Sequence, residues 1–87
     1  METALIAFSS STTANRLRKL AVSEGLSNVT LLQTPKSISH NGCTYSVKCS
    51  LHILPTLLDL ADAYNIKHGN VYREVVDTAG RKFYQKL

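Results

Sequence analysis

The stretch TALIAFSSSTT, residues 3–13, decides the fold because it joins a short apolar run to a cluster of hydroxyl side chains. Thr3 to Phe8 has the continuous apolar character of a buried central strand. A hydroxyl oxygen after it can cap a helix by accepting a hydrogen bond from an unpaired amide of the first turn. Apolar residues then recur at helical spacing, which predicts a helix from about Thr12 to Glu24, ended by Gly25.

The rest of the chain predicts three more strands and a second helix. Residues 28–33 are rich in β-branched and aliphatic side chains, which favour a strand. Residues 43–49, CTYSVKC, alternate between two faces, as a half-buried strand does. A helix is expected to begin near Leu54 with Pro55 in its first turn, where a missing amide costs little. Residues 71–76 are expected to form the last strand.

This β-α-β-β-α-β order predicts an α+β fold, a ferredoxin-like sandwich in which two helices cover one face of a four-stranded antiparallel sheet. At 87 residues the chain is one small domain, expected over residues 1–77 and followed by a basic C-terminal tail, residues 78–87. Its N-terminus does not resemble a signal peptide, and no apolar run reaches the roughly 20 residues of a membrane span. A cytoplasmic protein without membrane contact is therefore expected.

The positive charge is concentrated at the C-terminus. The formal charge is +4, and the ten residues from 78 onward carry three basic groups and no acidic one, so that the remainder is only +1. Charge of this kind is more typical of solvated surface lysines than of a nucleic-acid site.

The thiol of Cys43 is the strongest candidate for chemistry. In the predicted topology it follows a loop, residues 34–42, at the end of the sheet where the first helix begins. Amides and the dipole at a helix N-terminus stabilise anions and lower the pKa of a nearby thiol. The predicted anion- or partner-binding residues come from the helix start and the loop: Ser10, Ser11, Thr12, Thr13, Lys36, Ser39, His40 and Gly42. The alternative is that Cys43 is a small, half-buried strand residue.

Cys49 is expected to have a structural role in the core. Along an extended strand it lies roughly 20 Å from Cys43, too far for a disulfide. His40, Cys43, Cys49 and His52 have zinc-type spacing, but the alternation of residues 43–49 favours an extended strand that keeps the two pairs apart. No resident metal or cofactor is expected. A phosphate loop, paired catalytic carboxylates and a nucleophile elbow are also lacking, which favours a carrier or binding protein over a self-contained enzyme.

The sequence resembles a family of small bacterial selenium/sulfur carrier-like proteins over roughly residues 4 to 76. The first part of the shared pattern is met by Phe8, Ser10 and Ala14. The second part is a proline, a basic residue, an Ile-Ser pair and a cysteine beside a glycine, met by Pro35, Lys36, Ile38, Ser39, Gly42 and Cys43. Family members commonly have Arg in place of Lys36, and their glycine follows the cysteine, whereas Gly42 precedes Cys43. The resemblance implies that Cys43 accepts sulfur or selenium as a persulfide or perselenide, with donor and acceptor enzymes as partners.

Two other functions compete with the carrier. A sheet of this kind can present aromatic residues to single-stranded RNA, with Tyr45, Tyr72 and the basic tail as candidates. The strands lack the aromatic-rich pattern of RNA-recognition motifs, which disfavours nucleic acid as a partner. A module that binds protein through an exposed strand edge is the other alternative. The sequence leaves a homodimer open.

Overall fold

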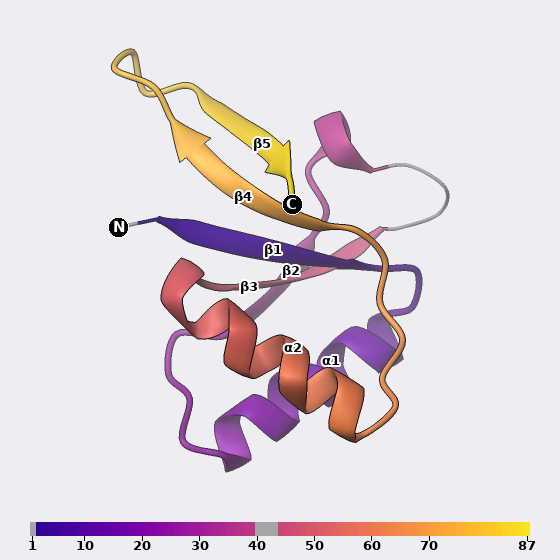
Figure 1. Ribbon diagram of the computed structural model, residues 1–87. Coiled ribbons are helices and arrows are strands. Elements are labelled where there is room, and N and C mark those ends of the chain that lie inside the picture. Colours follow the sequence, from indigo (N-terminus) through magenta and orange to yellow (C-terminus); the bar gives the residue numbers. More distant parts are fainter. Residues whose placement is uncertain (1, 40–43) are drawn as a thin grey trace.

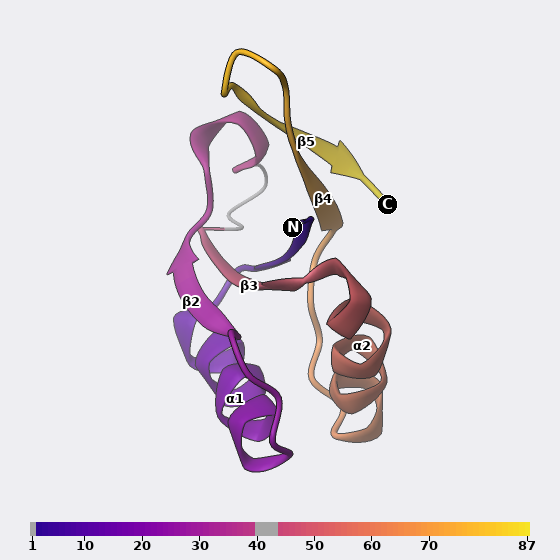
Figure 2. The ribbon, with the colours of Figure 1, turned by 90° about the vertical axis from the view of Figure 1, so that its left-hand side faces the viewer.

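The computed structural model of the protein describes residues 2–39 and 44–87. Within them the strands form one antiparallel sheet of the order β2-β3-β1-β4-β5, with both helices on one face (Figure 1 and Figure 2). The elements in chain order are β1 (Thr3–Phe8), α1 (Ser11–Ser23), β2 (Thr30–Gln33), the 3₁₀ turn η1 (Lys36–Ile38), β3 (Tyr45–Ser50), the 3₁₀ turn η2 (Leu51–Ile53), α2 (Leu54–Ala63), β4 (Val71–Val76) and β5 (Lys82–Lys86).

β1 is the central strand, as its apolar sequence predicts. It pairs with β3 along its whole length, from Thr3 opposite Ser50 to Phe8 opposite Tyr45, and with β4 on its other side. Residues 4–8 are at most 1% exposed because both faces of the strand are covered. Alternate side chains of β1 therefore enter two apolar clusters, one under the helices and one on the opposite, helix-free face of the sheet.

Local signals fix both helices close to their predicted bounds. The side chain of Ser10 caps α1 and accepts a hydrogen bond from the Thr13 amide at 3.4 Å. Gly25, at a φ of +80°, follows the end of the helix in the left-handed conformation that favours glycine. α2 begins at Leu54 with Pro55 in its first turn, as predicted.

Two strands begin later than the sequence pattern suggests. β2 starts at Thr30, because Asn28 has a φ of +61° and this left-handed conformation interrupts an extended chain. β3 starts at Tyr45 and runs to Ser50, and the predicted first residue of this strand, Cys43, lies outside the described residues.

The predicted four-stranded sheet is wrong, because the chain beyond residue 77 supplies a fifth strand. β5 pairs with β4 through a turn in which the carboxylate of Asp77 accepts hydrogen bonds from the amides of Ala79 and Arg81, at 2.9 and 2.8 Å. Gly80 has a φ of +82°, and its amide donates to the Asp77 carbonyl oxygen at 3.0 Å. Asp at the first turn position and Gly at the fourth are the usual signals of such a hairpin. These signals were overlooked among the basic residues that follow.

A carboxylate on the helix-free face connects four strands. Glu74 of β4 accepts hydrogen bonds from the hydroxyls of Thr3 and Tyr84, at 3.0 and 3.1 Å, and pairs with the Lys48 ammonium at 3.6 Å. Burial opposes its ionisation, but the two hydrogen bonds and the positive charges of Lys48 and Lys82 outweigh burial and lower the pKa of Glu74. The ionised carboxylate thus ties β5 and β3 to the centre of the sheet.

Cys49 lies in the cluster under the helices, as expected for a structural residue. It is opposite Ala4 of β1 and is 1% exposed. Burial raises the pKa of its thiol to about 11, because a thiolate loses its hydration there.

We expect the left-handed glycine of the hairpin to matter for stability. Gly80→Ala should lower the free energy of unfolding by about 1–2 kcal/mol, the cost of a left-handed conformation for a residue with a Cβ. Space is not limiting, since a Cβ at this position would have no heavy atom within 4 Å outside the neighbouring residues. Urea denaturation would measure the change, with Gly80→Asn as the matched control that should lose less. Equal stability of the Ala variant and the natural protein would contradict this turn geometry.

The buried thiol predicts a loss of stability in alkaline solution. Because the folded-state pKa of Cys49 is raised to about 11, the unfolded chain releases this proton first as the pH rises. The protonated thiol therefore contributes fully to the free energy of unfolding below about pH 9. This contribution, about 2–3 kcal/mol, is lost as the pH rises towards 11. Urea denaturation at about pH 8 and about pH 10.5 would measure it, with Cys49→Ala as the reference, because all other groups titrate alike in both proteins. A parallel fall in the two proteins would refute the assignment.

Candidate functional site

The end of the sheet where β1 stops carries the hydroxyl cluster that the sequence singles out. Ser10 caps α1 and shares a hollow of about 300 Å³ with the neighbouring hydroxyl side chains. The loop between α2 and β4 closes its other side. The lining residues are Phe8, Ser9, Ser10, Thr13, Arg16, Asn65, Ile66 and Lys67.

This hollow has the electrostatics of an anion site. The first turn of α1 contains no acidic residue, and the unpaired amides and positive end of the dipole at a helix N-terminus favour negative charge. Arg16 and Lys67 bring two cationic side chains to the same lining. Hydroxyls, amides and cations can therefore bind an anionic group here.

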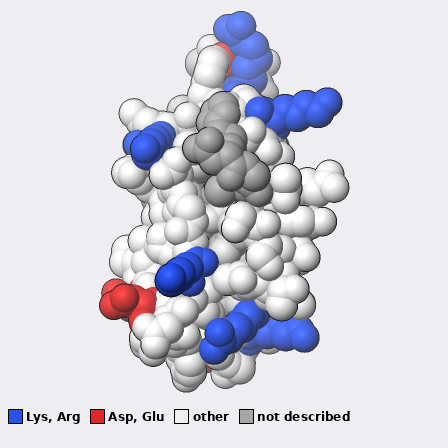
Figure 3. All heavy atoms as spheres, turned by 90° about the vertical axis from the view of Figure 1, so that its right-hand side faces the viewer, with Lys and Arg blue, Asp and Glu red and all other residues white. Residues whose placement is uncertain are grey.

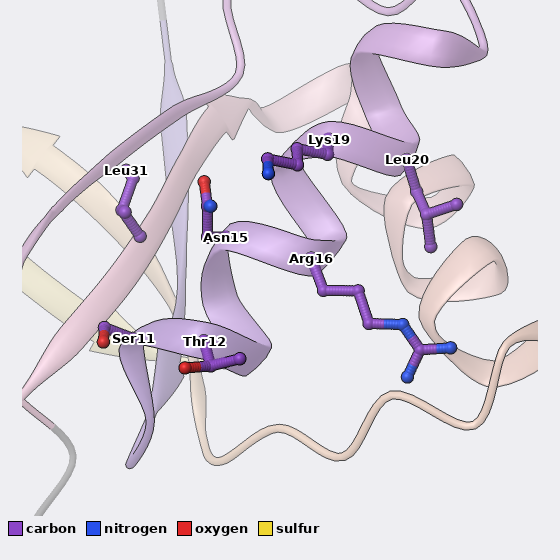
Figure 4. A pocket seen from close by; sticks show the side chains of 7 residues that line it. All are labelled: Ser11, Thr12, Asn15, Arg16, Lys19, Leu20 and Leu31. Carbon is purple, nitrogen blue, oxygen red and sulfur yellow. The ribbon is translucent and has the colours of Figure 1, made fainter.

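A second, larger hollow lies beside the first along the outer side of α1 (Figure 4). It measures about 740 Å³ and is lined by Ser11, Thr12, Asn15, Arg16, Lys19, Leu20 and Leu31. Leu31 of β2 forms its far wall, and Arg16 lines both hollows. The structure thus divides the four predicted hydroxyl residues, with Ser10 and Thr13 in the smaller hollow and Ser11 and Thr12 in the larger one.

The predicted thiol, Cys43, lies outside the described residues, as do His40 and Gly42. The chain on its C-terminal side is described: the Thr34 amide donates to the Thr44 carbonyl oxygen at 2.9 Å, and Tyr45 pairs with Phe8. Thr44 therefore enters the sheet beside the end of β1, from which the chain continues into α1.

Lys36 lies on the other side of the sheet. It begins η1, whose Ile38 packs against Leu5, Ala7 and Tyr72 of the helix-free face. In Figure 2 the chain that follows β2 turns away from the two helices. The structure therefore separates Lys36 from the hollow at α1, although both were predicted to surround one thiol. Ser39, at the end of the same turn, is half-buried.

Sequence reasoning missed Arg16, Asn65 and Lys67, although the topology could have indicated the last two. β4 runs antiparallel to β1, so the loop that leads into β4 must lie at the end of β1 where α1 starts. Two hydrogen bonds hold it there: the Gly69 amide donates to the Ala7 carbonyl oxygen at 2.7 Å, and the Ala7 amide donates to the Asn70 carbonyl oxygen at 3.0 Å.

Positive charge dominates this end of the molecule. Figure 3 looks onto it and shows Lys and Arg side chains spread from top to bottom, whereas acidic atoms are seen only near its margins. Cationic groups at the mouth of a site attract anionic substrates or the acidic surface of a partner protein.

The RNA-binding alternative has less support in this geometry. Tyr45 belongs to the cluster under the helices and Tyr72 is 7% exposed on the opposite face, so the two rings form no common surface for stacking bases. Of the zinc-type pattern, the structure describes Cys49 and His52. Among the described residues there is no group of three or more His, Cys, Asp or Glu side chains that could hold a metal ion. No helix in the described chain is long and apolar enough to span a membrane.

Comparison with curated proteins and with solved structures found no match to this chain. The profile of a family described as "Putative Se/S carrier protein-like" matches residues 3–73, which are 71 of the 87 residues. The matched stretch begins with β1, ends inside β4 and includes both cysteines and the start of α1. The chain therefore belongs to this Se/S carrier-like family.

Proposed function

We propose that this protein is a small thiol carrier, in which Cys43 accepts a sulfur or selenium atom as a persulfide or perselenide and passes it to an acceptor enzyme. The main support for the proposal is that the other cysteine, Cys49, is buried and protonated. The family suggests thiol-based transport, and the chain has two cysteines. Cys49 is buried with a pKa of about 11, which leaves about one thiolate in ten thousand at pH 7. Cys43 is therefore the candidate for the carrying thiol.

The anion hollow at the start of α1 supports this role. Both a thiolate and an ionised persulfide are anions, which helix amides and the cations of Arg16 and Lys67 stabilise. Thr44, the residue after Cys43, enters the sheet at the same end as this hollow. Ser10 and Thr13 line this hollow and are the residues we expect to face the loaded group, whereas Ser11 and Thr12 line the larger hollow beside it.

Each transfer step balances without an outside oxidant or reductant. The Cys43 thiolate attacks the outer sulfur of a donor enzyme's cysteine persulfide, the donor's S–S bond breaks, and the donor cysteine leaves as a thiolate. The new S–S bond stores the sulfur on Cys43. In delivery, a thiolate of the acceptor attacks that outer sulfur and Cys43 leaves as a thiolate.

The composition of the hollow suits a carrier. Its lining, as far as the structure describes it, contains hydroxyl, amide and cationic side chains but no carboxylate or imidazole. Such a lining stabilises an anion but supplies no general base, so that catalysis is left to the donor and acceptor enzymes. A reducing compartment such as the bacterial cytoplasm, in which thiols stay free, fits this role.

We also infer that β1 to β4 and the two helices form a ferredoxin-like unit extended by β5. The chain order β-α-β-β-α-β and the sheet order β2-β3-β1-β4 support this inference. The arrangement explains how the starts of α1, β3 and β4 come to one end of the sheet.

The first test is the reactivity of each cysteine in the folded protein. Alkylation with iodoacetamide, followed by mass spectrometry, should modify Cys43 with an apparent pKa below the ordinary value of about 8.5. Cys49 should stay unmodified until urea unfolds the chain, because burial keeps its thiol protonated. Equal and slow modification of both thiols would contradict the proposal. Arg16→Gln should raise the apparent pKa of Cys43 if the hollow stabilises the thiolate.

The second test is sulfur transfer itself. A cysteine desulfurase loaded with radioactive sulfur as its own persulfide is the donor, and the label bound to the carrier is measured on a non-reducing gel. Cys43→Ser should abolish loading, because serine cannot form a persulfide. Cys49→Ala is the matched control and should retain loading. Equal loading of the natural protein and Cys43→Ser would exclude Cys43 as the acceptor.

A further inference from the structure

We propose that the free edge of β5 binds an extended, acidic segment of a partner protein, which adds to the sheet as a sixth strand. This inference goes beyond the carrier function and does not depend on Cys43. β5 is the last strand of the sheet, and it lies away from the hollow at the start of α1 (Figure 1). The argument rests on the direction of its backbone groups and on its charge.

The hydrogen bonds of the hairpin show which backbone groups of β5 face outward. The Leu87 amide donates to the Val71 carbonyl oxygen at 2.9 Å, and the Asp77 amide donates to the Arg81 carbonyl oxygen at 2.9 Å. In an antiparallel pair such bonds involve alternate residues of each strand. The odd-numbered residues of β5 therefore bond to β4, whereas the amides and carbonyls of Lys82, Tyr84 and Lys86 point to the free edge. An extended segment can hydrogen-bond to these groups.

The charge of this edge selects the partner. Lys82 and Lys86 are exposed at the two ends of β5, and neither belongs to an ion pair within the described residues. Arg81, by contrast, pairs with Asp77 at 3.1 Å, and Lys48 pairs with Glu74. Lys82 interacts at longer range with Glu74, but this carboxylate already pairs with Lys48. The edge therefore keeps a net positive charge, which attracts carboxylates and repels basic segments.

The charge of this edge also disfavours a second copy of this chain as the partner that pairs with β5. Antiparallel pairing of two β5 strands about Tyr84 would set Lys82 of one copy opposite Lys86 of the other, and like charges in opposed positions destabilise a sheet. The other edge of the sheet, β2, has the sequence TLLQ and carries no charge that would select a partner.

A nucleic acid is also disfavoured. Tyr84 is half-buried and donates its hydroxyl hydrogen to Glu74, and Tyr72 is buried, so neither ring on this face is free to stack on a base. The row of outward amides and carbonyls, in contrast, matches a polypeptide backbone.

The spacing of β5 defines the segment that it would bind. Positions one to five of an antiparallel segment would lie opposite residues 86 to 82 of β5. A carboxylate at position one is then opposite Lys86, position four is opposite Phe83, and position five is opposite Lys82. Phe83 is 52% exposed and lies on the other face of β5 from the two lysines. The favoured segment is therefore acidic at positions one and five, apolar at position four, and able to donate its amide at position three.

A synthetic peptide tests this geometry directly. The probe is Thr-Glu-Thr-Val-Ile-Glu-Thr with blocked ends, and the protein is the ¹⁵N-labelled full chain carrying Cys43→Ser, so that thiol chemistry cannot contribute. Added peptide should slow hydrogen exchange at the amides of Lys82, Tyr84 and Lys86, because each gains a bond. The amides of Phe83 and Gln85, which already face β4, should change little.

Two control peptides separate strand addition from simple charge attraction. Replacing Val by Pro keeps the charge but removes the central amide, and should abolish the protection. Replacing both Glu by Lys keeps the backbone and should weaken binding at least about fivefold, since it turns two exposed ion pairs into repulsive pairs. In the protein, Lys82→Gln with Lys86→Gln should also weaken binding, while Arg18→Gln with Lys19→Gln, which removes the same charge from α1, should not.

Three outcomes would overturn the proposal. The first is unchanged exchange at the outward amides at the highest peptide concentration. The second is tighter binding of an oligothymidine to the same lysines, which would make this edge a nucleic-acid surface. The third is protection of the three amides without peptide together with a dimer in sedimentation, which would assign the edge to a second copy. The peptide controls need no change in β5, so the test stands even if the Lys82→Gln, Lys86→Gln protein unfolds.

Discussion

The burial of β1 on both faces is the constraint on which the rest of the structure depends. A strand whose five residues 4–8 are almost inaccessible needs a pairing strand on each side and a cover on each face. β3 and β4 supply the pairing, the helices cover one face, and Ile38 and Tyr72 help to cover the other. The position of the proposed site follows from the same strand, because the chain leaves β1 directly into the cap of α1.

The hollow at α1 shows how topology collects residues that are far apart in the sequence. The start of α1, the loop before β4 and the start of β3 come from three parts of the chain, but all lie next to the end of β1. Lys67 and Ser10 line the same hollow because β4 enters the sheet antiparallel to β1. The β1–β4 pair thus brings together the residues of the proposed anion site, which no continuous sequence motif encodes.

Local patterns in the sequence predicted four strands and both helices but not the fifth strand, at the edge of the sheet. A strand was predicted from the apolar run of residues 3–8, and the two helices were predicted from the cap at Ser10 and from Pro55. These signals are reliable because each acts within one turn or one strand. The fifth strand was missed because its residues, KFYQK, are mostly polar, as an edge strand tolerates. The sequence placed Lys36 with the hydroxyls of α1, whereas the structure has it in η1, whose Ile38 packs on the helix-free face, because position in a loop does not determine which face of a sheet the loop will cover. Cys49 was correctly assigned to the core because alternation with Val47 is a property of the strand itself.

The hairpin of β4 and β5 extends the sheet beyond the residues that match the family profile. The family match ends at residue 73, within β4, so the turn and β5 lie outside the region that defines the family. β5 contacts mainly β4, and the end of the sheet that holds the hollow does not rely on it. A change in the length or charge of β5 would therefore leave the residues that line the hollow in place. In this protein, the surface that β5 adds and the end of the sheet that holds the hollow can be altered separately.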